Sequence, residues 1–191
     1  MALQNLANPD LSLPPQLVFD TSFLLALRPG DDNPHTVTAQ AFARRLRPAI
    51  AALQSVAWIV LPVLQECYHI ILTSNLRRTR QALDPAVRPA NWLALYKSAP
   101  AMLKQGLPDL HRFDALLATI PVTSADQQNR GAARKVSALD KRLRYFIARY
   151  QLLPQDALIL AEAERLGVTA IVTLDRDWRR VNEFDIYTIP D

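Results

Sequence analysis

Four carboxylates of this chain stand in apolar surroundings, where a folded protein would tend to bury them. Asp20 and Asp175 each directly follow a strand-like segment, whereas Glu66 and Asp156 lie near the starts of helical segments. Carboxylates avoid such places unless they are paired, hydrogen-bonded or bound to a metal. If the strands are parallel and the four side chains converge, they form an oxygen-only site that suits Mg²⁺ or Mn²⁺.

Strand-like and helical segments alternate along the chain. The strand-like segments are short and apolar, and they are 17–19, 58–61, 119–122, 170–173 and 186–189. The best-marked helical segment between them is 154–166, which has a proline in its first turn and Gly167 at its end. This alternation predicts an α/β fold with a central, mostly parallel, five-stranded sheet between layers of helices. In such sheets ligands bind beyond the carboxyl ends of the strands, which is where Asp20 and Asp175 are placed.

The length of 191 residues predicts a single domain over 1–191 with a sizeable core, and its first 15 residues read as a loosely held lead-in. Cys67 is the only cysteine, which excludes an intramolecular disulfide and a cysteine-rich zinc site. The N-terminus lacks a signal-peptide pattern and no apolar run is long enough to cross a bilayer. We therefore expect a cytoplasmic protein without a membrane partner. The net charge of +4 is compatible with a polyanionic substrate.

Two further segments carry clusters of basic residues. Residues 76–111 interrupt the alternation with four prolines, and we interpret them as a helical insertion beside the sheet. Arg77, Arg78 and Arg80 in this insertion are candidate nucleic-acid contacts, because positively charged side chains bind phosphates. Residues 125–151 predict a long amphipathic helix, and its basic face is most simply an ordinary solvated face.

Each of the four acids also has an explanation that requires no metal. Asp20 is placed to cap the short helix that follows it, and Asp156 is placed to interact with the dipole of its own helix. Either Asp175 or Asp177 is placed to cap a short helix that begins at Trp178. Glu66 lies three residues before His69, within reach of a hydrogen bond to it. The joint placement of the four acids favours a shared site over four separate explanations.

These residues resemble the PIN domain family, a compact α/β fold of metal-dependent nucleases. The likeness is strongest over 152–190, where Pro-Gln-Asp-Ala-Leu-Ile and Thr-Leu-Asp-Arg-Asp-Trp are similar to the family's third and fourth acidic motifs. The segment Val-Phe-Asp-Thr-Ser at 18–22 resembles its opening strand and first acid, and Glu66 matches the second acid. Leu174 and Trp178 depart from the usual pattern without removing a ligand.

The resemblance implies a divalent-metal-dependent endoribonuclease that hydrolyses RNA phosphodiester bonds, with Mg²⁺ or Mn²⁺ as its cofactor. The catalytic metal ligands that it implies are Asp20, Glu66, Asp156 and Asp175, with Asp177 as a fifth metal ligand. The auxiliary residues could orient a water or contact a phosphate, and they are Thr21, Ser22, Thr173 and Arg176.

The expected substrate is single-stranded or structured RNA. Members of the family often act as the toxin of a VapC-like toxin–antitoxin pair, so an antitoxin protein is a candidate partner and a homodimer is a candidate assembly. The alternative function is that of a PIN-like module that binds RNA or a protein without cutting. The insertion leaves the choice of substrate or partner open. Metal-dependent cleavage that is lost on Asp20→Asn replacement would decide between enzyme and binding module.

Overall fold

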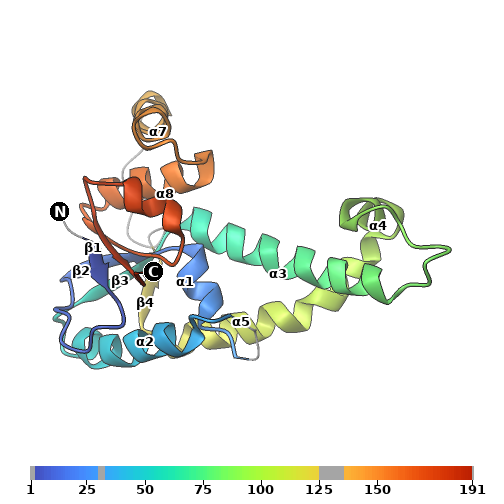
Figure 1. Ribbon diagram of the computed structural model, residues 1–191, viewed down its shortest axis with the longest axis horizontal. Helices are drawn as coiled ribbons and strands as arrows, with labels where there is room; N and C mark the ends of the chain where they lie inside the picture. Colours follow the sequence, from blue (N-terminus) through green and yellow to red (C-terminus); the bar gives the residue numbers. More distant parts are fainter. Residues whose placement is uncertain (1–2, 30–32, 125–135, 191) are drawn as a thin grey trace. The chain divides into compact units, whose positions relative to one another are not determined.

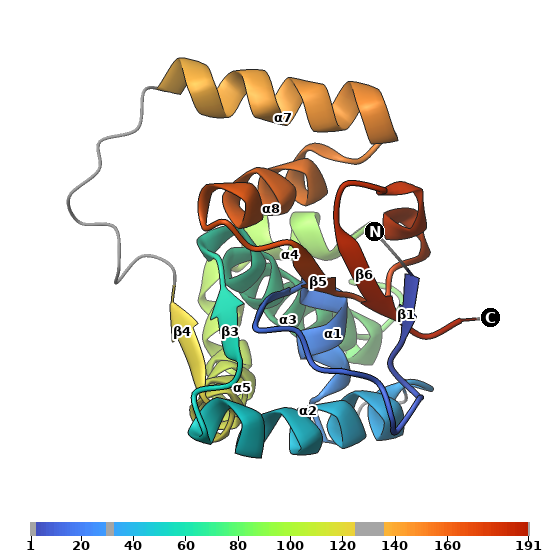
Figure 2. The same ribbon diagram turned by 90° about the vertical axis from the view of Figure 1, so that its left-hand side faces the viewer.

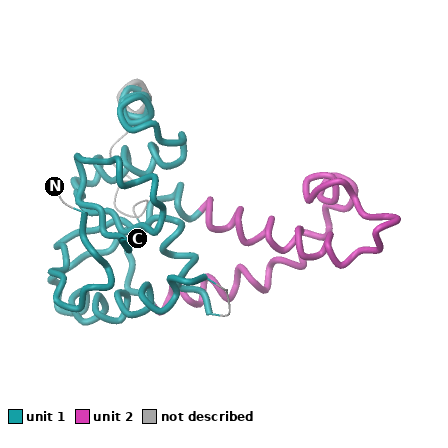
Figure 3. Tube along the Cα trace, viewed as in Figure 1, with its two compact units in different colours: residues 1–64, 120–191 teal, residues 65–119 magenta. Residues whose placement is uncertain are grey.

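The computed structural model describes residues 3–29, 33–124 and 136–190 of the chain (Figure 1). The chain divides into two compact units (Figure 3). The first unit contains residues 1–64 and 120–191, and the second contains residues 65–119. The predicted insertion at 76–111 falls wholly within the second unit.

The first unit is built on a sheet of six strands in the order β1-β6-β5-β2-β3-β4, and every pair of neighbouring strands is parallel. The strands are β1 (Leu3–Asn5), β2 (Gln16–Phe19), β3 (Val56–Ile59), β4 (Val122–Ser124), β5 (Ala170–Val172) and β6 (Asp185–Thr188). All five predicted strands are present, so the α/β fold with a parallel sheet is confirmed. The third predicted strand begins later than expected, after Pro121, and it forms one edge of the sheet.

The sixth strand, β1, corrects the expectation of a loosely held lead-in. It pairs with β6 in the register Leu3↔Ile186, and the amide of Leu6 then donates to the carbonyl of Thr188 at 2.9 Å. Arg45 also fixes the residues that follow, because its guanidinium donates to the carbonyls of Asn8 and Leu11 at 2.8 and 2.6 Å. Residues 3–11 take part in all of these contacts through their backbone groups. The side-chain pattern of this segment therefore gave no signal of them.

Among the described residues, the first unit contains the α-helices α1 (Thr21–Ala26), α2 (Thr36–Ala51), α7 (Val136–Tyr150) and α8 (Pro154–Arg165), together with the first residues of α3. α2 lies on one side of the sheet and α8 on the other, with α7 packed on the outside of α8 (Figures 1 and 2). α7 accounts for most of the predicted helix 125–151, of which residues 125–135 lie outside the described part of the chain. α8 ends as predicted, because Gly167 adopts a φ of 71° and the amide of Val168 donates to the carbonyl of Ala163 at 2.9 Å.

Aromatic side chains pack around the central strand β2. The ring of Phe19 stacks on Phe23 with centroids 4.9 Å apart, and Phe23 meets Phe42 edge-on at 5.9 Å. All three side chains are fully buried, and each such burial contributes roughly 1.5–3 kcal/mol to stability. Because Phe19 is the last residue of β2, this cluster also fixes the backbone at Asp20, the next residue.

The second unit consists of helices. It contains α3 (Leu61–Ala82) from residue 65 onward, α4 (Trp92–Ser98), the 3₁₀-helix η1 (Pro100–Gly106) and α5 (Leu107–Thr119). α3 and α5 run antiparallel, since Tyr68 donates to Asp114 at 2.5 Å while Thr79 donates to Gln105 at 3.1 Å. No helix among the described residues has the length and apolar character needed to cross a membrane.

Candidate functional site

Two neighbouring strands of the first unit carry the centre of the candidate site. β2 and β5 pair in the register Phe19↔Val172, and the amide of Asp20 donates to the carbonyl of Val172 at 2.9 Å. Asp20 and Thr173 therefore follow the carboxyl ends of adjacent parallel strands. This is the edge of the sheet at which the sequence predicts a site.

The carboxylate of Asp20 is held by hydroxyl groups. Its Oδ2 atom accepts hydrogen bonds from the hydroxyl of Ser22 at 2.6 Å, from the hydroxyl of Thr173 at 2.8 Å and from the amide of Ser22 at 3.3 Å. The side chain is buried, with 3% of its surface exposed. The amide contact makes Asp20 the N-cap of α1, so the capping role considered for this residue is present.

Burial raises the pKa of Asp20 above its ordinary value, and the hydrogen bonds from Ser22 and Thr173 oppose this effect only in part. In the part of the chain that the structure describes, no basic side chain pairs with this carboxylate. A buried carboxylate without a counter-charge is costly, and a bound cation would remove that cost.

The same two hydroxyls connect Asp20 to Asp175. The Oγ of Ser22 and the Oγ1 of Thr173 lie 3.2 Å apart, although the residues are 151 positions apart in the chain. The amide of Asp175 donates to Thr173 Oγ1 at 3.0 Å, and the amide of Leu174 donates to Ser22 Oγ at 2.9 Å. Ser22 and Thr173 thus orient the first acid directly, whereas the sequence suggested that they orient a water or a phosphate.

Asp175 lies at the start of the 3₁₀-helix η2 (Arg176–Arg180) and caps it. Its Oδ1 atom accepts from the amide of Asp177 at 2.9 Å, and its side chain is half-buried. Asp177 is exposed and its Oδ1 atom lies 3.3 Å from a guanidinium nitrogen of Arg180. Arg176 is also exposed, and Thr21 is buried in the first turn of α1. Of the two aspartates considered for this cap, Asp175 forms it, and the helix begins at Arg176 instead of Trp178. The capping bond uses only the Oδ1 atom of Asp175.

Asp156 and Glu66 lie on two different helices. Asp156 is half-buried in the first turn of α8, as the sequence predicts. The residue before it, Gln155, donates a side-chain hydrogen bond at 2.8 Å to the carbonyl of Pro62 in the first turn of α3. Glu66 is half-buried one helical turn after Pro62 and is the second residue of the second unit. No sequence motif indicates Gln155, because its partner is a backbone carbonyl.

The donors available for a metal are carboxylate and hydroxyl oxygens, and the single cysteine is buried. Among residues 3–29, 33–124 and 136–190, no three or more Asp, Glu, His or Cys side chains are gathered closely enough to hold an ion by themselves. The oxygen set nevertheless fits a hard ion such as Mg²⁺, which usually keeps several waters and is bound through one or two carboxylates together with substrate phosphates. Asp20 is the residue that fits this requirement best.

The three arginines predicted to contact nucleic acid belong to α3 and have different surroundings. Arg77 is exposed, whereas Arg78 forms an ion pair with Asp109 at 2.8 Å. Arg80 donates to the backbone carbonyls of Pro89 and Ala90 at 2.6 and 2.9 Å. Arg80 therefore fixes the loop between α3 and α4. Of these three arginines, Arg77 is the best candidate for a phosphate contact, because it is exposed.

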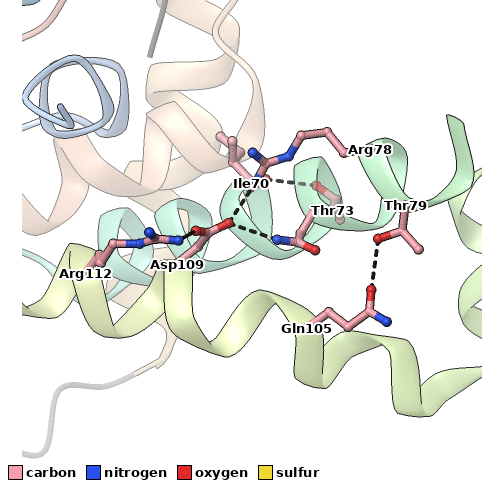
Figure 4. A network of polar contacts seen from close by, with 8 residues as sticks. Ile70, Thr73, Arg78, Thr79, Gln105, Asp109 and Arg112 are labelled. Carbon is pink, nitrogen blue, oxygen red and sulfur yellow. Dashed lines mark hydrogen bonds and ion pairs between the residues drawn. The ribbon is translucent and has the colours of Figure 1, made fainter. Parts of the chain in front are cut away.

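Asp109 links α5 to α3 (Figure 4). It lies between Arg78 and Arg112 and also accepts a hydrogen bond from Asn75 at 2.8 Å. Burial by itself would raise the pKa of Asp109, but the bonds from Asn75 and Arg112 and the charges of both arginines lower it overall. This cluster stabilises the helix pair of the second unit.

The comparison with known protein families agrees with the sequence-based resemblance. Residues 17–183 match the sequence profile of the PIN domain. Among solved structures, one match is the crystal structure of VapBC2 from Rickettsia felis bound to a DNA fragment from their promoter, at 13% sequence identity and a TM-score of 0.49, covering 92% of this chain and 99% of that chain. No curated protein matches the chain. Because the profile match spans most of the sequence, the chain belongs to the PIN domain family.

Proposed function

We propose that this protein is a divalent-metal-dependent endoribonuclease that hydrolyses RNA phosphodiester bonds. The observation that carries the proposal is Asp20, a buried carboxylate at the carboxyl edge of the sheet, with three hydrogen bonds to one oxygen and no basic partner among the described residues. Members of the PIN domain family are generally nucleases, and an acid in this environment suits the binding of a cation.

The proposed metal ligands are Asp20, Glu66, Asp156 and Asp175, with Asp177 as an additional ligand, and the proposed ion is Mg²⁺ or Mn²⁺. When bound, such an ion polarises a phosphate and lowers the pKa of a coordinated water. Ser22 and Thr173 hold Asp20 in one orientation, and their donated hydrogen bonds favour its ionised form. Arg176 is exposed next to Asp175, where we propose that it contacts a phosphate of the RNA.

A second candidate function is a PIN-like module that binds RNA or a protein without cutting. Two observations favour it, namely the helix cap formed by Asp175 and the absence, within the described residues, of a group of three metal-binding side chains. For the nuclease and for an RNA-binding module alike, we propose single-stranded or structured RNA as the polyanionic ligand. We propose a cytoplasmic location for either function. An antitoxin protein and a second copy of the chain remain proposed partners.

Cleavage of a labelled single-stranded RNA by the purified full-length chain tests the proposal. We expect cleavage with Mg²⁺ or Mn²⁺, none in EDTA and none with Asp20→Asn. The matched control is Asp10→Asn, which makes the same chemical change at an exposed position of the lead-in and should retain activity. Cleavage that persists in EDTA would contradict the metal dependence. RNA binding without cleavage by the wild-type chain would support the binding module instead.

A further inference from the structure

The side chain of Gln155 joins two segments of the first unit that are distant in sequence. Its Nε2 atom donates to the carbonyl of Pro62 at 2.8 Å, across 93 positions of the chain. Gln155 is the second residue of α8 and immediately precedes Asp156, whereas Pro62 is the second residue of α3. The bond therefore connects the first turn of one helix with the first turn of the other.

The first turn of α8 lacks two of the usual local hydrogen bonds of a helix start. Leu153 precedes the helix and forms no side-chain cap, and Pro154, the first helical residue, has no amide hydrogen to donate. The amide of Ala157 makes the first backbone bond, to Leu153 at 3.0 Å. The start of the helix, where Asp156 lies, is therefore fixed in part by the contact that Gln155 makes with α3.

The acceptor side of this bond is rigid. Only Val60 separates β3 from α3, and the amides of Val63 and Leu64 both donate to the carbonyl of Val60, at 3.0 and 3.3 Å. Pro62 is buried and its ring restricts the backbone.

We propose that Gln155 is a positioning residue for the metal-dependent reaction. Its amide holds the first turn of α8, which carries Asp156, against the first turn of α3. This inference rests on the proposed function, because it requires Asp156 to act as a metal ligand. Residues that orient metal ligands typically contribute a factor of about 10 to 100 in metal affinity or activity.

Gln155→Met replacement tests the inference, because methionine has a similar length and volume but no hydrogen-bond donor. Gln155→Asn is the second variant, since it keeps an amide but is one methylene too short to reach Pro62. The matched control is Gln81→Met, which makes the same change at an exposed position near the end of α3. Mn²⁺ affinity is measured on the full-length, folded protein by electron paramagnetic resonance, together with thermal unfolding in the absence of metal.

We expect both Gln155 variants to bind Mn²⁺ about tenfold more weakly than wild type, whereas Gln81→Met binds with wild-type affinity. In RNA cleavage, kcat should fall for both Gln155 variants while KM stays nearly unchanged. Wild-type Mn²⁺ affinity in a folded Gln155 variant would overturn the inference, even with a lower melting temperature, because the bond would then serve stability alone. Failure of wild type itself to bind Mn²⁺ would instead overturn the proposed function and the inference with it.

Discussion

The hydroxyl of Thr173 donates a hydrogen bond of 2.8 Å to the Oδ2 atom of Asp20, although 153 positions separate the two residues in the chain. The bond forms because β2 and β5 are adjacent and pair in parallel, which places the residues after both strands side by side. Ser22 completes the arrangement from the first turn of α1. The two hydroxyls together hold the carboxylate of Asp20 in a place from which water is largely excluded.

The burial of Asp20 predicts a stability effect that depends on pH. Its pKa is higher in the folded chain than its ordinary value of 3.8, so ionisation destabilises the fold as the pH rises from about that value through the folded pKa. Asp20→Asn should therefore raise the melting temperature of the metal-free protein at pH 7, by roughly 2–4 °C for each kcal/mol gained. The gain should shrink toward zero as the pH approaches 3.8, where the wild-type carboxyl is neutral in both states.

Differential scanning calorimetry across this pH range checks the prediction, with Asp10→Asn as the control. Mn²⁺ should stabilise wild type through binding to the folded state but should have little effect on Asp20→Asn. If Asp20→Asn is less stable than wild type at neutral pH without metal, the negative charge of Asp20 is already compensated within the folded chain.

Removal of the Thr173 hydroxyl should act on Asp20 directly. Thr173→Val deletes one donor from its Oδ2 atom, which raises the pKa of Asp20 further and disfavours the ionised form. A hydrogen bond to a charged group contributes about 1.5–3 kcal/mol, so we expect Mn²⁺ binding to weaken by at least tenfold at neutral pH. Binding should recover in part at higher pH, where Asp20 ionises despite the lost donor.

Thr73→Val provides the matched control for this change. The hydroxyl of Thr73 is also buried, but it donates to the carbonyl of His69 within its own helix at 2.8 Å. Its loss should affect stability and leave Mn²⁺ affinity unaltered. Equal Mn²⁺ affinity in Thr173→Val and wild type, measured by isothermal titration calorimetry, would exclude a role for this hydroxyl in metal binding.

Asp109 should stabilise the helix pair of the second unit at neutral pH. Because its folded pKa lies below the ordinary value, its contribution is present above pH 3.8 and is lost as the pH falls through the folded pKa. Both arginine partners are largely exposed, so each ion pair contributes only about 0.2–1 kcal/mol. Asp109→Asn should therefore cost on the order of 1 kcal/mol.

Hydrogen exchange at pH 7 measures this effect as faster exchange of the amides in α3 and α5. High salt should reduce the difference between Asp109→Asn and wild type, because it screens exposed ion pairs. Asp84→Asn, an exposed turn residue, is the control. Unchanged protection in Asp109→Asn would mean that the other contacts between the two helices hold them together without the charge of Asp109.

Arg77 and Arg80 of α3 should behave differently in a test of RNA binding. Arg77→Gln removes an exposed charge and should weaken binding without loss of stability, reducing the slope of log K against log salt by about 0.7 for a single strand. Arg80→Gln should lower stability instead, because its guanidinium holds the carbonyls of Pro89 and Ala90. Fluorescence anisotropy over a salt series distinguishes the two, and an unchanged slope for Arg77→Gln would remove it from the RNA contacts.

Local sequence patterns determined much of the fold. Short apolar runs such as Leu17–Phe19 form strands because their side chains are buried on both faces of a parallel sheet, and alternation with helices requires that sheet to be parallel. Pro154 marks the start of α8 and Gly167 marks its end. Both act on the backbone of a few neighbouring residues, and therefore a local pattern is enough to predict the two ends of the helix. The placement of Asp20 and Asp175 after strands followed from the same patterns.

Only the tertiary structure decided the contacts that depend on register and on backbone groups. The distance of 3.2 Å between the hydroxyls of Ser22 and Thr173 follows from the pairing Phe19↔Val172, which no local pattern specifies. Gln155 and Arg80 bind main-chain carbonyls, which every residue possesses, so their partners have no signature in the sequence. Local periodicity fixes which residues form an element, whereas long-range hydrogen bonds depend on how the elements pack.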